Sequence, residues 1–421
     1  MLKKILMMAV FTLALGNLSD AYAEAPLSVN ETLAVHAYVA DHPVARVLWI
    51  PSEYGVLPQE EALAKHLQQQ GISVWIPDFF ESYFLPVAPS SLRKVPPAVV
   101  TRWVKRLHQQ EPKLPLFVIA PNQAAALAVK SLVQFQQTPQ NMVGLILLNP
   151  NLYIETPAAG TVAAYWPAVQ QVNLPIYVIQ AQLSPWRWHL STLQQKLSSA
   201  GSDVFVKLIP QVRDRYYFRP DAMAVEQQKA AHLKGALFAA MQTLSPYMKP
   251  ARQAQVQVGA KPKPVPSQPA DSKATIPVYK GEQNRPLVLE DLNGRTYNLA
   301  DYKGQVVLVN FWASWCPPCV HEMPSMARLK KRLKGEPFEI LAANLAEAPP
   351  AIDAFIKAHP VNFPILLDQE GSAVQAWKVF AYPSSYLIDK KGRIRYALFG
   401  GFDWDSPAAL NKIEALLAET P

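Results

Sequence analysis

Cysteine is scarce in this chain, which holds two among 421 residues. So few thiols exclude a small scaffold cross-linked by several disulfides, and they exclude a zinc or iron–sulfur protein rich in cysteine ligands. Internal repeats are also absent. Half of the residues are hydrophobic and 17% are charged, which excludes a disordered chain, a coiled coil and a collagen-like repeat. The length predicts a globular protein of two or three domains.

Long hydrophobic runs are missing after the N-terminal segment, since later runs such as residues 142–148 have the length of a strand. Residues 1–23 combine a basic start, an apolar stretch over 5–15 and a small-residue end at Ala23. This layout is typical of a secretory signal peptide. We expect cleavage after Ala23, export to the periplasm, no lipid anchor because no cysteine follows, and no membrane span in the mature chain.

The net charge of +8 is concentrated in one segment. Between residues 249 and 285, seven Lys or Arg side chains stand against two acidic ones, which leaves +5 there. Because the positive charge lies in one segment and is not spread over a folded surface, nucleic acid is not expected as a partner. Residues 249–286 are rich in Pro, Lys and Gln and carry no periodic apolar positions, which predicts an extended linker.

This linker separates an N-terminal domain, residues 24–248, from a C-terminal domain, residues 287–421. In the first, apolar runs alternate with helical patterns, as the strand 47–50, the helix 59–70 and the strand 74–76 illustrate. Uniformly apolar strands that alternate with helices are typical of a parallel sheet covered on both faces. The second domain is also predicted to be α/β.

Both thiols lie in Cys316-Pro317-Pro318-Cys319, between a predicted buried strand over 306–311 and a predicted helix over 317–334. Proline is tolerated in the first turn of a helix, so Cys316 is expected at the helix N-terminus, where the positive pole favours a thiolate. Lowering a thiol pKa from ~8.5 to ~7 raises its ionised fraction at pH 7 from about 3% to about half. We expect Cys316 to be the nucleophile and Cys319 the resolving thiol of a dithiol/disulfide couple.

Other interpretations of the cysteine pair are weaker. A structural disulfide here would close a four-residue loop and constrain the unfolded chain little. A zinc site needs four ligands, and the chain adds only scattered histidines to two thiols. Covalent haem attachment needs a histidine directly after Cys319, but Val320 intervenes before His321. We therefore expect redox chemistry without a cofactor or a metal.

The segment around the cysteines carries a specific resemblance. Residues 306–319 read VVLVNFWASWCPPC and continue with Glu322-Met323-Pro324. Over about Ile276–Pro421 the chain closely resembles the periplasmic thioredoxin-like thiol:disulfide reductases of the TlpA/ResA type. The resemblance implies a thioredoxin fold, reduction of disulfides in periplasmic client proteins, and re-reduction by a membrane thiol donor of the DsbD type. A dedicated role in haem-protein maturation is not expected, because residues 381–385 lack the acidic residue that those members carry.

Three further residues take their meaning from this resemblance. Pro383 matches the cis-proline that faces the cysteine pair; the alternative is an ordinary strand-entry proline. Glu322 matches an acidic residue that moves protons during exchange; the alternative is a solvated helix carboxylate. Asn310 stands where cytoplasmic thioredoxins have a buried Asp, so that proton acceptor is absent. The predicted catalytic residues are Cys316, Cys319, Pro383 and Glu322.

The N-terminal domain weakly resembles an α/β-hydrolase, mainly over residues 47–150. The nucleophilic serine of that family lies in Gly-x-Ser-x-Gly at a strand-to-helix turn. The matching residues 120–124 read APNQA, so Asn122 replaces the nucleophile and the flanking glycines that give the turn room are missing. His189 is interpreted as a surface histidine. We expect a non-catalytic domain whose aromatic residues line a pocket or pack in the core, namely Trp186, Trp188, Tyr216 and Tyr217.

The leading hypothesis is an exported enzyme, a thiol:disulfide oxidoreductase whose N-terminal domain binds clients or positions the reductase. The alternatives are a redox-sensing adaptor with little turnover and an esterase that carries an accessory redox domain.

Overall fold

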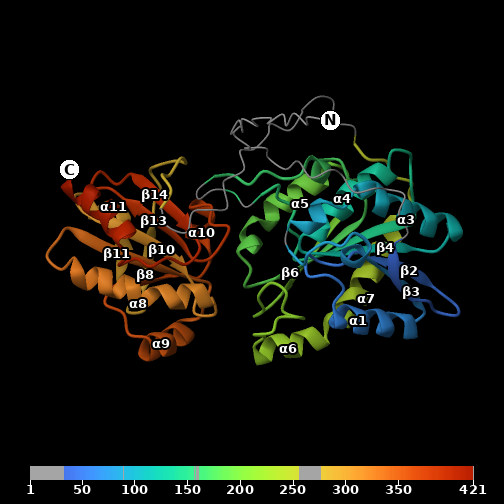
Figure 1. Cartoon of the computed structure of the whole chain (residues 1–421), viewed down its shortest axis with the longest axis horizontal. Coiled ribbons are helices and arrows are strands. Elements are labelled where there is room, and N and C mark those ends of the chain that lie inside the picture. Colours follow the sequence, from blue (N-terminus) through green and yellow to red (C-terminus); the bar gives the residue numbers. More distant parts are fainter. Residues whose placement is uncertain (1–32, 89, 156, 158–160, 256–275, 421) are drawn as a thin grey trace, which may run out of the picture.

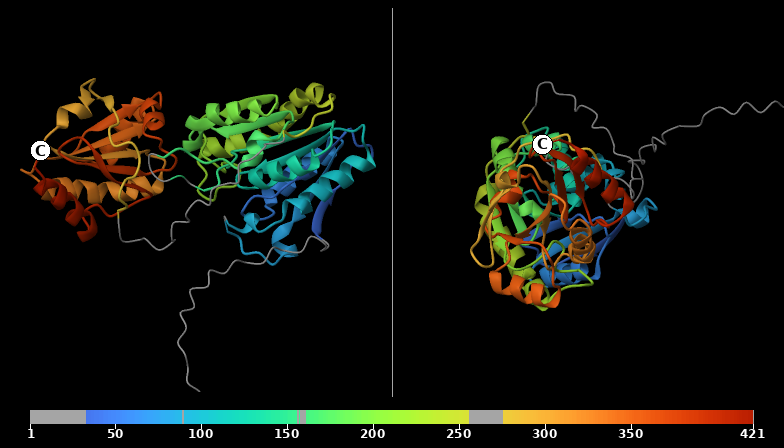
Figure 2. Two further views of the ribbon diagram at one scale, coloured as in Figure 1. Left: turned by 90° about the horizontal axis from the view of Figure 1, so that it is seen from above. Right: turned by 90° about the vertical axis from the view of Figure 1, so that its left-hand side faces the viewer.

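The computed structural model describes residues 33–88, 90–155, 157, 161–255 and 276–420. The predicted signal peptide and the middle of the predicted linker lie outside these residues. The described residues form two α/β domains that lie side by side along the long axis of the molecule (Figures 1 and 2). Each helix within these ranges is too short or too polar to cross a membrane.

Seven strands form the sheet of the N-terminal domain, in the order β1-β3-β2-β4-β5-β6-β7. Strands β2 to β7 run parallel, and the edge strand β1 pairs antiparallel with β3. The predicted parallel sheet is therefore confirmed. The strand bounds are β1 Ala34–Tyr38, β2 Ala45–Trp49, β3 Ile72–Asp78, β4 Leu116–Pro121, β5 Val143–Leu148, β6 Ile176–Ala181 and β7 Val204–Ile209.

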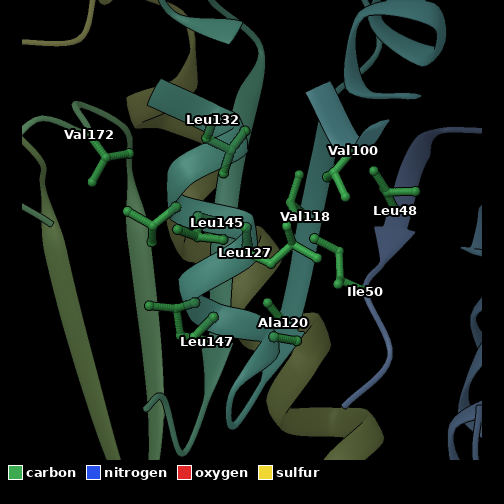
Figure 3. Packing of buried hydrophobic residues seen from close by; sticks show 14 of the residues in the cluster. Leu48, Ile50, Val100, Val118, Ala120, Leu127, Leu132, Leu145, Leu147 and Val172 are labelled. Atoms are coloured by element: carbon green, nitrogen blue, oxygen red, sulfur yellow. The ribbon is translucent and has the colours of Figure 1, made fainter. Parts of the chain in front are cut away.

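Helices cover both faces of this sheet, because successive strand residues point to opposite sides. Leu48 belongs to the cluster beneath α3, α4 and α5, whereas its neighbour Val47 belongs to the cluster beneath α1 and α7. Figure 3 shows the first cluster, with Val118 and Leu145 of the sheet beside Leu127 of α4. The helices are α1 Pro58–Gln69, α2 Phe79–Ser82, α3 Pro97–Gln110, α4 Ala124–Phe135, α5 Leu190–Ser199, α6 Ala224–Ala231 and α7 Leu233–Leu244, with 3-10 turns η1 Ser91–Arg93, η2 Pro167–Gln170, η3 Pro185–His189 and η4 Ser245–Met248.

The C-terminal sheet has the order β14-β13-β10-β11-β12-β8-β9. Strands β10, β11 and β12 are parallel, whereas β13, β14, β8 and β9 pair antiparallel. Helices α8, α9 and α11 pack on one face and α10 on the other. A parallel βαβ unit followed by a β-hairpin and a closing helix is the thioredoxin fold, as predicted. The bounds are β8 Val288–Asp291, β9 Thr296–Asn298, η5 Leu299–Tyr302, β10 Val306–Trp312, α8 Pro317–Arg332, β11 Phe338–Leu345, α9 Pro349–Ala358, β12 Ile365–Asp368, α10 Ser372–Ala376, β13 Ser384–Ile388, β14 Ile394–Phe399 and α11 Pro407–Ala418.

The packed domains extend into the predicted linker from both sides. Arg252 forms a β-bridge with Gln140 of the N-terminal domain, and Val278 forms one with Tyr396 of β14. Residues 256–275 of the predicted linker lie outside the described part of the chain.

Candidate active site

The cysteine pair lies where β10 passes into α8. Strand β10 ends at Trp312, and Cys316 is the N-cap residue of α8, with Pro317 at the first helical position. Cys316 and Cys319 are joined by a disulfide with a Cα–Cα distance of 5.3 Å, so the structure describes the oxidised form. The helix therefore begins at the residue that the sequence predicts.

The two cysteines differ in their exposure to solvent. Cys316 keeps 6% of its surface exposed, whereas Cys319 keeps none. The backbone N–H of Cys319 points at Sγ of Cys316, with N and Sγ 3.4 Å apart. In the reduced protein this donor and the helix N-terminus favour a thiolate at Cys316. Of the two cysteines, only Cys316 is in contact with solvent.

Pro383 immediately precedes β13, the strand that pairs with β10. The peptide bond between Tyr382 and Pro383 is cis, as the resemblance implies. Because Ser384 pairs with Phe311 of β10, the proline is next to the end of the strand that leads to Cys316. The ring of Tyr382 packs against Trp315, with ring centroids 5.7 Å apart.

Glu322 is buried one turn beyond Cys319 on α8, with 3% of its surface exposed. Residues three apart on a helix share a face, so the side chains of Glu322 and Cys319 lie on the same buried face of α8. The Nδ2 of Asn310 donates to Oε1 at 2.7 Å, and the N–H of Phe402 donates to Oε2 at 3.1 Å. Burial raises the pKa of Glu322 to about 7. The alternative of a solvated carboxylate is therefore wrong.

Asn310, which stands in β10 where cytoplasmic thioredoxins have an Asp, is hydrogen-bonded to Glu322. Asn310 is fully buried in the strand and also donates to Ser385 Oγ at 2.9 Å. The strand residue Asn310 is thus hydrogen-bonded to a buried carboxyl on α8. Sequence reasoning identified both residues without finding that they are bonded to each other.

Asn122 occupies a tight turn between β4 and α4 and adopts a left-handed backbone, with φ of 45°. Asparagine tolerates this backbone region better than most residues other than glycine. The neighbouring N–H of Gln123 donates to Glu53 at 3.3 Å. The turn between β4 and α4 therefore carries the amide side chain of Asn122.

Two buried carboxyls lie at the same edge of this sheet, and sequence reasoning missed both. Burial raises the pKa of Glu53 and raises the pKa of Asp214 to about 6. Glu53 follows β2 and Asp214 follows β7, at strand ends where polar residues are expected to meet. Across the described ranges, no cluster of three or more His, Cys, Asp or Glu side chains is arranged to hold a metal ion.

The interpretation of His189 as a surface histidine is wrong. Its Nε2 lies 3.1 Å from the carbonyl oxygen of Val379, and its ring stacks on Phe380 with centroids 3.8 Å apart. Both partners belong to the C-terminal domain, whose packing a local sequence pattern does not reveal. Tyr216 and Tyr217 are buried in the N-terminal core, as one of the two readings of these aromatic residues expects.

Comparison with known proteins places relatives on the C-terminal part of the chain. The family model described as Redoxin matches residues 269–417. The thiol-disulfide oxidoreductase ResA of Bacillus subtilis is 38% identical over 117 residues, which cover 28% of this chain and 65% of that protein. The thioredoxin-like protein YneN of Bacillus subtilis is 36% identical over 127 residues, covering 30% of this chain and 74% of that protein.

Among solved structures, a putative thioredoxin from Neisseria meningitidis is 30% identical, with a TM-score of 0.30, and the match covers 32% of this chain and 91% of that one. The chain spans somewhat less than two thirds of the ResA length. The Redoxin match lies within the predicted linker and the C-terminal domain. The likeness of the N-terminal domain to a hydrolase remains a prediction.

Proposed function

Because the chain belongs, through its C-terminal domain, to the thioredoxin-like thiol-disulfide oxidoreductase family, we propose that it reduces disulfides in periplasmic proteins. The observation that carries this proposal is the Cys316–Cys319 disulfide at the start of α8, with only Cys316 partly exposed. Residues 1–23 act as a signal peptide that is cleaved after Ala23, which delivers the chain to a compartment where protein disulfides form.

The reaction proceeds in two exchanges. The Cys316 thiolate attacks one sulfur of the client disulfide, which forms a mixed disulfide and releases the other client sulfur as a thiolate. The Cys319 thiolate then attacks Sγ of Cys316, releases the second client thiolate and leaves the Cys316–Cys319 disulfide. Two electrons pass to the client, and its two sulfurs take up protons. A membrane thiol donor of the DsbD type then restores the dithiol.

Glu322 is the proposed proton acceptor for Cys319. A buried thiol must lose its proton before it attacks, and the acceptor must lie in the same interior. The carboxyl is buried on the same face of α8, and its pKa of about 7 is close to the working pH. Pro383 completes the site from the neighbouring strand, where a client segment is expected to approach.

The N-terminal domain is proposed to be an α/β-hydrolase-like module without catalysis that binds clients or positions the reductase. The left-handed turn at Asn122 supports the likeness, because a sharp strand-to-helix turn is the hallmark of that family. An amide at the turn does not act as an acyl acceptor, which argues against the esterase alternative.

The direct test uses the exported full chain with Cys319→Ser, which stops the second exchange. We expect a mixed disulfide between Cys316 and a client protein to accumulate and to be released by dithiothreitol. Cys316→Ser with Cys319 intact is the matched control and is expected to trap nothing. Equal trapping by both variants, or by neither, contradicts the assignment of Cys316 as nucleophile.

A further inference from the structure

The two domains touch at loops that flank the cysteine pair. Helix α10 lies on the side of the C-terminal domain that faces the N-terminal domain (Figure 1), and it contacts η3. Between them lies a cavity of about 270 Å³ lined from both domains, by Tyr165, Trp188 and His189 on one side and Lys378 and Phe380 on the other. This volume is below that of a pocket for a drug-sized ligand.

Trp188 lies directly against Gly371, the residue that precedes α10. A Cβ built on Gly371 would stand 2.1 Å from the Trp188 ring, far closer than two carbons approach. Only glycine therefore admits the ring at this position. The guanidinium of Arg187 lies 4.2 Å from the centre of the same ring, so the indole is covered on another side as well.

His189 and Phe380 form the second part of the contact. The two rings are nearly parallel, with an interplanar angle of 12°, and the His189 Nε2 reaches the carbonyl of Val379. Phe380 is only 5% exposed and clusters with Tyr153 and Ala163, which also belong to the N-terminal domain. Phe380 precedes the cis-proline Pro383 by three residues, so the N-terminal domain contacts the segment that leads to Pro383.

Arg213 forms the third part, next to the nucleophile. Its Nη1 lies 3.4 Å from the carbonyl oxygen of Trp315, which precedes Cys316. Glu226 and Asp221 hold the guanidinium, at 2.6 Å and 3.2 Å. Because Glu226 and Asp221 fix the position of its guanidinium, Arg213 acts here as an oriented hydrogen-bond donor. The N-terminal domain thus contacts both the residue that precedes Cys316 and the segment that precedes Pro383.

We propose that Trp188 and His189 are specificity-determining residues, which hold the N-terminal domain over the approach to Cys316 and select disulfides by size. This inference rests on the proposed function. Small disulfides pass to the 6% exposed Cys316, whereas a disulfide within a folded protein reaches it only when the domains part. The chemistry at sulfur is the same for both substrates.

The test compares two substrates in single turnovers of the chemically reduced full chain. Hydroxyethyl disulfide is the small probe, and insulin is the folded protein whose disulfides need room. Gly371→Ala inserts a methyl group where the Trp188 ring lies, and Trp188→Ala removes the ring from the other domain. We expect each substitution to raise the insulin rate at least fivefold relative to the hydroxyethyl disulfide rate.

The matched control is Gly392→Ala. Gly392 has a φ of 78°, close to the 68° of Gly371, but nothing lies within 4 Å of an added Cβ. Gly392→Ala therefore introduces similar backbone strain without a clash. Its ratio of insulin rate to hydroxyethyl disulfide rate is expected to equal that of the wild type. A ratio within twofold of wild type in both Gly371→Ala and Trp188→Ala overturns the size selection. Failure of the wild type to reduce even hydroxyethyl disulfide overturns the proposed function instead.

Discussion

The Glu322 carboxyl makes protein stability depend on pH. Its pKa is about 7 in the folded protein against 4.5 for a free side chain, because burial disfavours the charge. Between these values the folded protein keeps a proton that the unfolded chain has lost, so rising pH lowers the free energy of unfolding. We expect Glu322→Gln to gain roughly 2–4 kcal/mol relative to wild type between pH 4 and pH 8. Urea unfolding of the oxidised proteins measures this, and a pH-independent difference contradicts it.

The same substitution tests proton transfer. Glutamine keeps the shape of Glu322 but accepts no proton, so the resolving step is expected to slow roughly 10- to 100-fold at pH 7. Stopped-flow measurement of mixed-disulfide decay gives this rate. Glu339→Gln is the control. Glu339 lies on β11, forms an ion pair with Lys330 at 2.8 Å, and is not proposed to act in thiol–disulfide exchange. Unchanged decay in Glu322→Gln would remove the carboxyl from the mechanism.

Helices and buried strands follow closely from local patterns. The helix predicted over 59–70 forms as Pro58–Gln69, and the one predicted over 317–334 ends two residues earlier at Arg332. The edge strand β1 was not predicted, because none of its residues is fully buried and an apolar run is lacking. Edge strands take their place from pairing with a neighbour, which the sequence pattern does not show.

The packing of α4 on the N-terminal sheet provides a test of domain independence. Leu145 of β5 is fully buried beside α4 (Figure 3). We expect Leu145→Ala to lower the free energy of unfolding of the N-terminal domain by roughly 2–5 kcal/mol, because it leaves a cavity. The single-turnover rate with hydroxyethyl disulfide is expected to stay the same. If Leu145→Ala lowers this rate together with the stability of the N-terminal domain, the C-terminal domain is not a separate catalytic unit.

The arrangement of the whole molecule is least visible in the sequence. The motif around Cys316 identifies the C-terminal fold and its reactive pair, since neighbouring residues carry that information. The contacts of Trp188 with Gly371 and of His189 with Val379 join positions about 190 residues apart. The residue types alone do not indicate these contacts, which form only when the two complete domains pack together.

In the mechanism proposed above, Cys316 is a nucleophile whose thiol is made acidic by the start of α8 and by the N–H of Cys319. The most direct measurement is the rate of Cys316 alkylation against pH in the full-length Cys319→Ser variant. We predict that the rate follows a thiol with a pKa of ~7 or lower. A rate that rises only around pH ~8.5, as for a free cysteine, contradicts the account.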